Sequence, residues 1–397
     1  YTQPDFPAVN HHWASGVIFY WVHEAAGFKG LSAFYIFISV LAALIFVWIA
    51  MKRADSRFVL LCAVFLAPLI GDRTEIRPEG LSYVFLGLIF LILDNFRKGN
   101  LNFYKTLIFS AFIQIIWINC HIFFFLGPTL IGLHFVADLI NKKDSPSPRQ
   151  YLILLATTTL VGLINPFHIH GLLTPLTIFQ EYGYMLAENQ SVFFMQDRFG
   201  SPEYLHVEIL AILLVIAFAA LAIKKGLRKF LPELFTVLFF GILAFIAVRG
   251  ITMFALLAVP IGAGLVAHFV EKLNYKQVKP AGIAGLSLSI VFLLIGLLNV
   301  DDLQAKGKSK LLSYLSPIKT VGENSYTRLG LIPGVNQSAD FFIKTQMRGP
   351  IFNNYDIGGY LIYHLDGKEK VFVDNRPEAY SVEFFEDIYT PMQEKEE

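Results

Sequence analysis

Long apolar runs recur along most of this sequence, and they constrain the fold more than any other feature. A helix that crosses the hydrocarbon core of a bilayer needs about 20 mostly apolar residues. Because 55% of the residues are hydrophobic and only 16% are charged, a soluble globular enzyme and a disordered chain are both excluded. Ten runs approach or reach the spanning length: 33–51, 57–71, 80–96, 105–118, 122–141, 150–166, 205–223, 230–248, 250–271 and 281–299.

Charge and cysteine content exclude further classes. The formal net charge is +1, so the chain lacks the basic excess that is typical of nucleic-acid-binding proteins. Its two cysteines, Cys62 and Cys120, are too few for a disulfide framework or a cysteine-based metal site. The sequence starts at Tyr1 without a signal peptide, and we expect both of its ends to be truncated relative to the gene product.

Basic residues alternate between successive loops and orient the expected spans. The short loops between the second and third, fourth and fifth, and eighth and ninth runs hold only Arg73, Arg77 and Arg249. Since Lys and Arg concentrate in cytoplasmic loops, the other short loops are expected in the cytoplasm, and both ends of the sequence outside it. These cytoplasmic loops hold sixteen basic residues, at 52, 53, 57, 97, 98, 105, 142, 143, 149, 224, 225, 228, 229, 272, 276 and 279.

The expected organisation has three parts. Residues 1–32 form part of a first external loop, in which 14–27 is too short to span and is expected to be a helix lying in the membrane interface. Residues 33–300 form the transmembrane domain, with a long external loop at 165–204. The overall fold class is therefore an α-helical polytopic membrane protein with about ten transmembrane helices here, and eleven or more in a longer chain.

The tail, residues 301–397, changes composition and loses the long apolar runs. Alternating helix and strand signals predict a small extracytoplasmic α/β domain that ends too soon to close a full sheet. The expected helices are 339–347 after Ser338 as N-cap, 358–365 and 381–389, and the expected strands are 350–352 and 370–374.

Charges at the membrane edge are costly, so polar clusters there mark candidate sites. The loop 71–80 holds Arg73 and Arg77 among three carboxylates that include Glu75. A guanidinium suits phosphate oxygens, and the carboxylates could orient the arginines or hold a metal. A solvated loop with internal ion pairs is an equally good interpretation. Arg249 could likewise snorkel to lipid headgroups or clamp an anionic ligand.

Two further clusters lie at predicted outer helix ends. Asn119 and His121 join the fourth and fifth runs, where capping of helix ends is the favoured role. A neutral histidine there could instead donate to a phosphate or act as a base. For His168 and His170, a helix stop driven by Pro166 is favoured over a metal site, because residues two apart do not share a helix face.

The remaining candidates lie in the long external segments. Glu188 stands in the loop 165–204, where no spacing fixes its ligand. Asp374 and Arg376 follow an expected strand end, where α/β domains bind ligands, although a structural ion pair fits equally well. In the first segment, His12 belongs to a His-His-Trp interfacial anchor, and Asp5 is by elimination the carboxylate that could activate an acceptor.

Read in order, these pieces resemble the GT-C superfamily of integral-membrane glycosyltransferases, in particular an uncharacterised bacterial branch related to protein mannosyltransferases. The resemblance covers nearly the whole chain, and the order of the pieces carries it. They are His12-Trp13, Arg77-Pro78-Glu79, 117–121 (Trp-Ile-Asn-Cys-His), Asn165-Pro166-Phe167, 188–191 (Glu-Asn-Gln-Ser), Arg249, 354–360 (Asn-Tyr-Asp-Ile-Gly-Gly-Tyr) and 371–376 (Val-Phe-Val-Asp-Asn-Arg).

This resemblance implies a transferase that moves a sugar from a polyprenyl-phosphate carrier to a protein or glycan acceptor, on the extracytoplasmic face of the bacterial inner membrane. We assign Arg73, Arg77 and Arg249 to the lipid phosphate, and His121 to orientation or proton transfer. The family's catalytic Asp follows a first helix that is absent here, so either Asp5 or a residue upstream of Tyr1 holds that role. No metal ligands are assigned, and a divalent metal stays open as a cofactor.

Two alternatives remain. A membrane subunit or scaffold could retain the fold without the reaction, alone or with other membrane subunits. A transporter is the third hypothesis, but transporters place polar residues or broken helices near the bilayer midplane. Here the polar clusters gather at the outer edge, while runs such as 33–51 and 281–299 have apolar centres.

Overall fold

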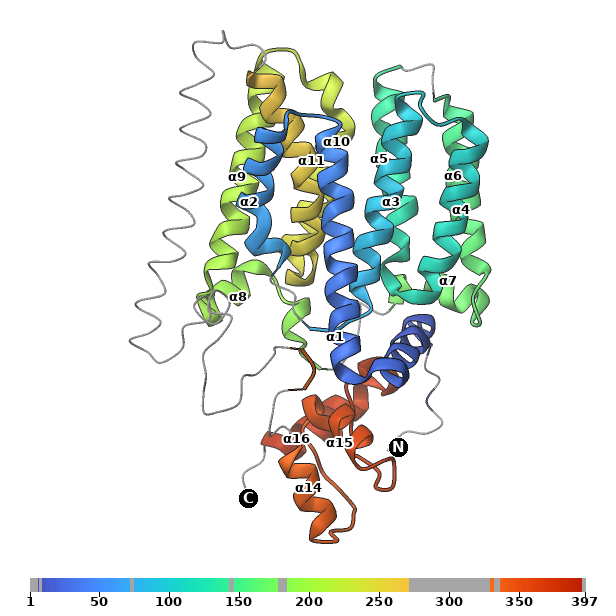
Figure 1. Cartoon of the computed structure of the whole chain (residues 1–397), viewed down its shortest axis with the longest axis vertical. Helices are drawn as coiled ribbons and strands as arrows, with labels where there is room; N and C mark the ends of the chain where they lie inside the picture. The colour runs from blue at the N-terminus through green and yellow to red at the C-terminus, as the bar shows by residue number, and fades with distance from the viewer. Residues whose placement is uncertain are drawn as a thin grey trace.

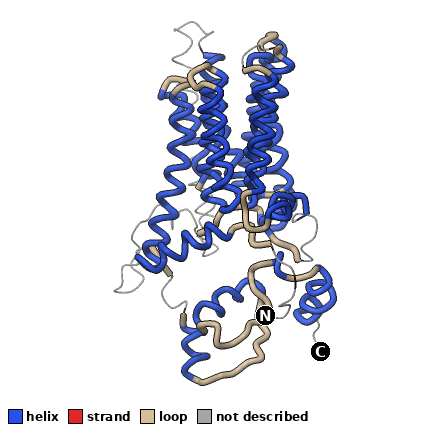
Figure 2. Tube along the Cα trace, turned by 90° about the vertical axis from the view of Figure 1, so that its right-hand side faces the viewer, coloured by secondary structure: helices blue, strands red, loops and turns tan. Residues whose placement is uncertain are grey.

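The computed structural model describes Phe6 and residues 9–71, 75–142, 146–177, 184–270, 329–331 and 336–394. Every regular element in these ranges is a helix, as the tube view shows (Figure 2). Two predicted site residues, Asp5 and Arg73, and the predicted span 281–299 lie outside the described residues.

A bundle of long helices occupies one part of the molecule, and the tail lies below it (Figure 1). The elements of the bundle and its connections are α1 (Trp13–Met51), α2 (Ser56–Ile70), α3 (Glu79–Arg97), α4 (Phe103–Cys120), η1 (Ile122–Phe125), α5 (Leu126–Ile140), α6 (Pro148–Leu160), η2 (Val161–Leu163), α7 (His168–Thr177), η3 (Ala187–Asn189), α8 (Val192–Phe199), α9 (Pro202–Ile223), η4 (Leu227–Phe230), α10 (Leu231–Ile246), η5 (Val248–Gly250) and α11 (Ile251–Val270).

Seven helices of the described chain are long and apolar enough to cross a membrane, or eight if one bent pair counts as a span. The bent pair is Pro148–Leu163 with His168–Leu176, which meet at 115°. The sequence predicted nine spans over the same residues. The difference is α2, which has only 15 residues and packs against α11. The chain is therefore a multi-pass membrane protein, and its described residues hold fewer full spans than predicted.

α1 is two helical segments joined at a sharp kink. Gly27 has φ 61° and ψ −166°, a backbone conformation that residues with a Cβ rarely adopt. The first segment, which includes the exposed side chains of Tyr20 and Trp21, matches the separate helix predicted at 14–27. It turns away from the bundle and lies next to the tail (Figure 1).

Buried ion pairs join the helices at the end of the bundle that carries the basic loops. Arg53, in the turn after α1, contacts Asp94 of α3 at 2.6 Å and Glu233 of α10 at 3.2 Å. Arg97 of α3 contacts Asp138 of α5 at 2.8 Å, and the Tyr151 hydroxyl of α6 donates to the same carboxylate. Charges removed from water need such partners, and these contacts join four helices to the turn after α1.

The tail contradicts the predicted α/β domain, because its described residues form helices and no strand. Its elements are α14 (Gln337–Lys344), η6 (Tyr355–Ile357), α15 (Gly358–His364), η7 (Pro377–Ala379), η8 (Phe384–Tyr389) and α16 (Thr390–Glu394). The helices predicted at 358–365 and 381–389 are found, whereas the first tail helix begins before Ser338, with Asn336 as N-cap.

One asparagine explains why the two predicted strands do not pair. The side-chain oxygen of Asn353 accepts from the Phe372 amide at 2.9 Å, and its side-chain nitrogen donates to the Val373 carbonyl at 2.8 Å. These are backbone groups that a neighbouring strand would otherwise satisfy. Pro350, in the other predicted strand, has no N–H to donate to a ladder.

Aromatic side chains form the core of the tail and attach it to the bundle. Tyr355, Phe385 and Tyr389 are buried together. Tyr184, from the loop before η3, stacks on Tyr355 with ring centroids 4.5 Å apart. On the other side, Tyr363 packs against Phe28 just after the α1 kink, at 5.2 Å. The tail thus contacts the rest of the chain through α1 and through the loop before η3.

We predict that Gly27→Ala lowers the thermal stability of the detergent-solubilised protein, by about 1–3 kcal/mol, because a Cβ strains the backbone at the kink. Gly16→Ala is the matched control: Gly16 lies in the same helical segment and a Cβ there meets nothing within 4 Å. That variant should keep or slightly raise the melting temperature. Equal melting temperatures for the two variants would contradict a required kink.

Candidate functional site

Six chain segments meet at the end of the bundle that faces the tail. They are the start of α1, the start of α3, the break between α4 and η1, the η3 and η5 turns, and the tail segment 374–378. Polar side chains from each segment interact with those of another, as the following contacts show. The sequence motifs at His12, Arg77, His121, Glu188 and Arg249 are therefore neighbours in space.

His121 breaks the chain between two helices and is buried. Its extended backbone ends α4, and its Nδ1 accepts from the Phe123 amide at 3.4 Å as the cap of η1. The Trp117 indole N–H donates to the Ser82 hydroxyl oxygen at 2.8 Å. That oxygen lies 2.9 Å from His121 Nδ1, so the Ser82 hydrogen is available to donate to it.

This chain of donors assigns the tautomer of His121. Since Nδ1 accepts from Ser82 and from the Phe123 amide, the ring proton belongs on Nε2. Burial lowers the pKa of His121 well below its usual value, and the charges of Arg249, His11 and His12 lower it further. His121 is thus a neutral hydrogen-bond donor, which fits an orienting role better than that of a general base.

Asn119 holds three segments together. Its side-chain oxygen accepts from the Trp13 indole at 2.9 Å, and its amide nitrogen donates to the carbonyls of Ile115 and Ile164, each at 2.8 Å. These contacts join the start of α1 to α4 and to the end of η2. Asn119 is therefore a structural residue at the edge of the site, in line with the favoured capping interpretation.

Glu188 brings together the two arginines that the sequence assigned to a phosphate. Its carboxylate contacts Arg77 from the start of α3 and lies 3.9 Å from Arg249 of η5. Arg249 also donates to the Asn189 side chain at 2.9 Å, and Arg77 contacts Glu75 at 2.6 Å. The two guanidinium groups, which are far apart in sequence, therefore converge on one carboxylate.

The Arg249 guanidinium connects this pair to His121. It lies over the Phe123 ring, 4.8 Å from the ring centroid, and its side chain is only 11% exposed. Its positive charge lowers the pKa of both His11 and His121. Arg77, in contrast, is 38% exposed. One arginine thus lies inside the site, and the other borders it.

The tail contributes an ion pair in which only the carboxylate is buried. Asp374 is buried, and both of its carboxylate oxygens accept from the Arg376 guanidinium. The Asp374 amide donates to the Tyr380 hydroxyl at 3.1 Å. Arg376 in turn lowers the pKa of His12, after the larger effect of burial. The predicted ion pair is present, and it places a cation near the histidines of the first segment.

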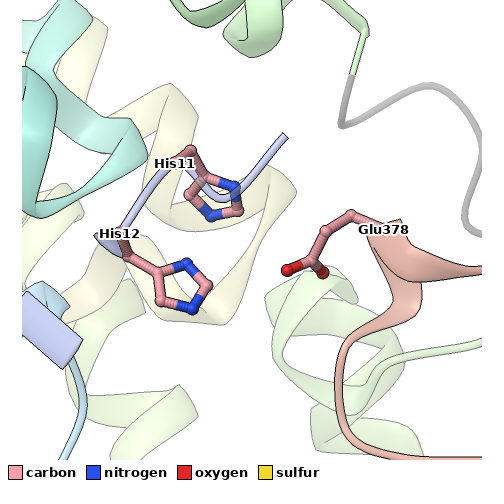
Figure 3. Close-up of side chains that lie close together, drawn as sticks. All are labelled: His11, His12 and Glu378. Atoms are coloured by element: carbon pink, nitrogen blue, oxygen red, sulfur yellow. The ribbon is translucent and has the colours of Figure 1, made fainter. Parts of the chain in front are cut away.

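His11, His12 and Glu378 form a compact group across the interface between the first segment and the tail (Figure 3). Each offers one donor atom, and the three atoms lie within 4.8 Å of one another. Burial lowers the pKa of His11 to about 3 and lowers that of His12, so both imidazoles are neutral at physiological pH. Burial also raises the pKa of Glu378. This donor set could hold a divalent cation.

Sequence reasoning missed some members of the site. Glu378 lies two residues beyond the quoted tail motif, and nothing in its spacing relates it to His11. Ser82 sits inside an apolar run, where a small hydroxyl gives no signal. Conversely, His168 and His170 are exposed in α7, in line with the favoured helix-stop interpretation.

No protein-family model matches this chain, and a search of curated proteins finds no significant similarity.

We predict that Glu188→Gln destabilises the protein by about 1–3 kcal/mol, because it leaves the nearly buried Arg249 without its carboxylate partner. The matched control is Glu75→Gln. The side chain of Glu75 is 63% exposed, and its ion-pair partner Arg77 is 38% exposed. Because water screens such a pair, the expected loss is about 0–1 kcal/mol. Thermal unfolding in one detergent measures both. A larger loss for Glu75→Gln would contradict this ranking.

We also predict that stability falls as the pH drops below about 6.5, toward about pH 5. The unfolded chain protonates His121 near its ordinary pKa, while burial keeps the folded imidazole neutral, so the unfolded state binds more protons in that range. Above that range the effect vanishes. Melting temperatures against pH should fall less steeply for His121→Gln than for the wild type, and His170→Gln, at an exposed histidine, should match the wild type. An unchanged slope in His121→Gln would contradict the assignment.

Proposed function

We propose that this protein is a membrane glycosyltransferase that moves a sugar from a polyprenyl-phosphate carrier to an acceptor on the extracytoplasmic face. The observation that carries the proposal is the convergence of Arg77 and Arg249 on Glu188, next to the neutral donor His121. These residues belong to motifs on which the resemblance to GT-C transferases rests. The multi-pass helical bundle gives a lipid-linked substrate access from the bilayer.

The proposed reaction needs cationic groups at the leaving phosphate. The bond between the sugar's anomeric carbon and the phosphate oxygen breaks, and a bond forms to the acceptor oxygen. The acceptor's proton goes to a base, and the carrier leaves as polyprenyl phosphate, with its new charge on oxygen. Fixed guanidinium groups stabilise such charge without reorganisation. Arg77 and Arg249 supply them, and Glu188 orients both before the substrate arrives.

The proposed roles of the other residues follow from their surroundings. His121 presents an Nε2–H that can donate to a phosphate or sugar oxygen, since Nδ1 already accepts from its neighbours. The acceptor base is assigned to Asp5 or to an Asp preceding Tyr1, as the resemblance implies. Arg376, held by Asp374, borders the histidines from the tail side, where an acceptor would approach.

Native mass spectrometry of the purified chain, with added polyprenyl phosphate, tests this function. The wild type should retain one carrier lipid. Arg77→Ala should weaken its binding by about tenfold or more, the usual effect of losing a charge-assisted contact to phosphate. Arg57→Ala is the matched control: Arg57 is an exposed, ion-paired arginine of α2, at the other end of the bundle, and its loss should leave lipid binding unchanged.

Folding of Arg77→Ala is checked by its melting temperature, and Arg77→Lys, which keeps the charge, should bind the carrier with intermediate strength. Equal binding by Arg77→Ala and Arg57→Ala would contradict the assigned phosphate site. A wild type that retains no carrier at any added concentration would overturn the transferase proposal and favour a subunit without the reaction.

A further inference from the structure

We propose that His11, His12 and Glu378 bind one divalent transition-metal ion of the zinc class, which fastens the first segment of the chain to the tail. This inference concerns a binding site beyond the transferase activity, and it does not depend on that activity. It rests on the geometry of three donors that two distant parts of the chain bring to one point (Figure 3).

The donor set matches the chemistry of this class of ion. Imidazole nitrogen and carboxylate oxygen are common zinc ligands, and two histidines with one glutamate form a site with three protein ligands and an open fourth position. Tetrahedral bonds to zinc place donors about 3.4 Å apart. The three donor atoms lie within 4.8 Å of one another. Side-chain rotations that move each donor atom by roughly 1 Å would bring the three to bonding positions.

His11 carries a second observation that points to a ligand. Its Nδ1 is buried and has no partner at good hydrogen-bond geometry in the described part of the chain, although the Val9 backbone lies near enough to raise the pKa of the ring slightly against the larger effect of burial. A buried imidazole nitrogen without a partner costs free energy, and a metal ion would satisfy it. The ring of His12 lies edge-on to that of His11 at 4.6 Å, and the Glu378 carboxylate faces the pair across the gap (Figure 3).

The nearby cations are compensated by carboxylates of their own. Arg249 lowers the pKa of His11, and Arg376 lowers that of His12, so both positive charges are felt at the site. Arg249 is paired with Glu188, however, and Arg376 with Asp374. Glu378 adds a further negative charge, and neutral imidazoles add none, so the ion meets a ligand set of charge −1.

The position of the ion gives it a structural role. His11 and His12 immediately precede α1, while Glu378 lies in η7 of the tail. One ion would replace a noncovalent interface by three bonds between these segments. The ion would lie at the tail side of the candidate functional site, near Arg376.

Metal binding to the whole chain tests this inference directly. The protein is purified in detergent, stripped with a chelator, and titrated with Zn²⁺, with Co²⁺ as a spectroscopic probe of tetrahedral coordination. One ion should bind per chain and raise the melting temperature. Glu378→Gln and His12→Gln should each weaken binding by about tenfold or more, since even residues that only orient a ligand have effects of that size.

The control variants change the same residue types at exposed positions outside the proposed site. Glu383→Gln, at an exposed glutamate of the tail, and His170→Gln, at an exposed histidine of α7, should bind Zn²⁺ as the wild type does. Melting temperatures of the stripped variants should match that of the stripped wild type, which separates loss of a ligand from loss of the fold. If Glu378→Gln is unstable when stripped, the Co²⁺ spectrum of His12→Gln tests the site instead, and it should lose the tetrahedral signature of the wild type.

The inference is overturned if the wild type binds no stoichiometric ion, or if both ligand variants bind as tightly as the two controls. These measurements use no sugar and no carrier lipid. Failure of the metal site therefore leaves the transferase proposal intact, and failure of carrier binding leaves the metal site intact.

Discussion

A charge removed from water needs a partner, and the arrangement of this bundle depends on that constraint. At the end with the basic loops, Arg53 and Arg97 are buried in ion pairs that join α3, α5, α10 and the turn after α1. At the opposite end, the polar groups lie on loops and helix breaks, and their partners come from distant segments. The first end holds the helices together. The second end holds the candidate site, and its polar groups border the tail.

Breaks in the helices, rather than the helices themselves, position the candidate site. The chain turns at His121 between α4 and η1, at Arg249 in η5, and at Glu188 in η3. Side chains at these breaks contact side chains of other segments at the same end of the bundle. Hydrogen bonds from Asn119 and Ser82 then fix the breaks, because each joins at least two segments. A rigid scaffold with irregular ends is a common way to hold functional groups.

The sequence predicted most of the long apolar helices, because a membrane-spanning run leaves a strong compositional signal. It failed where a single side chain decides the structure. The predicted strands of the tail have the right composition, yet Asn353 satisfies the backbone groups that would have paired them. Glu378 gave no signal, because its relation to His11 and His12 exists only in three dimensions. Asp5 and Arg73 lie outside the described residues, so their predicted roles stay predictions.

The shared carboxylate of Glu188 has a consequence for how the site responds to anions. Glu188 belongs to the η3 turn, whereas its partner Arg77 lies just before α3 and Arg249 lies in η5, so this one residue joins the loop that contains η3 to the bundle. An anion that binds between the guanidinium groups competes with Glu188 for them. Anion occupancy and attachment of the loop are therefore thermodynamically linked: each weakens the other by the same factor. Such reciprocity would make the loop more readily released when the site is filled.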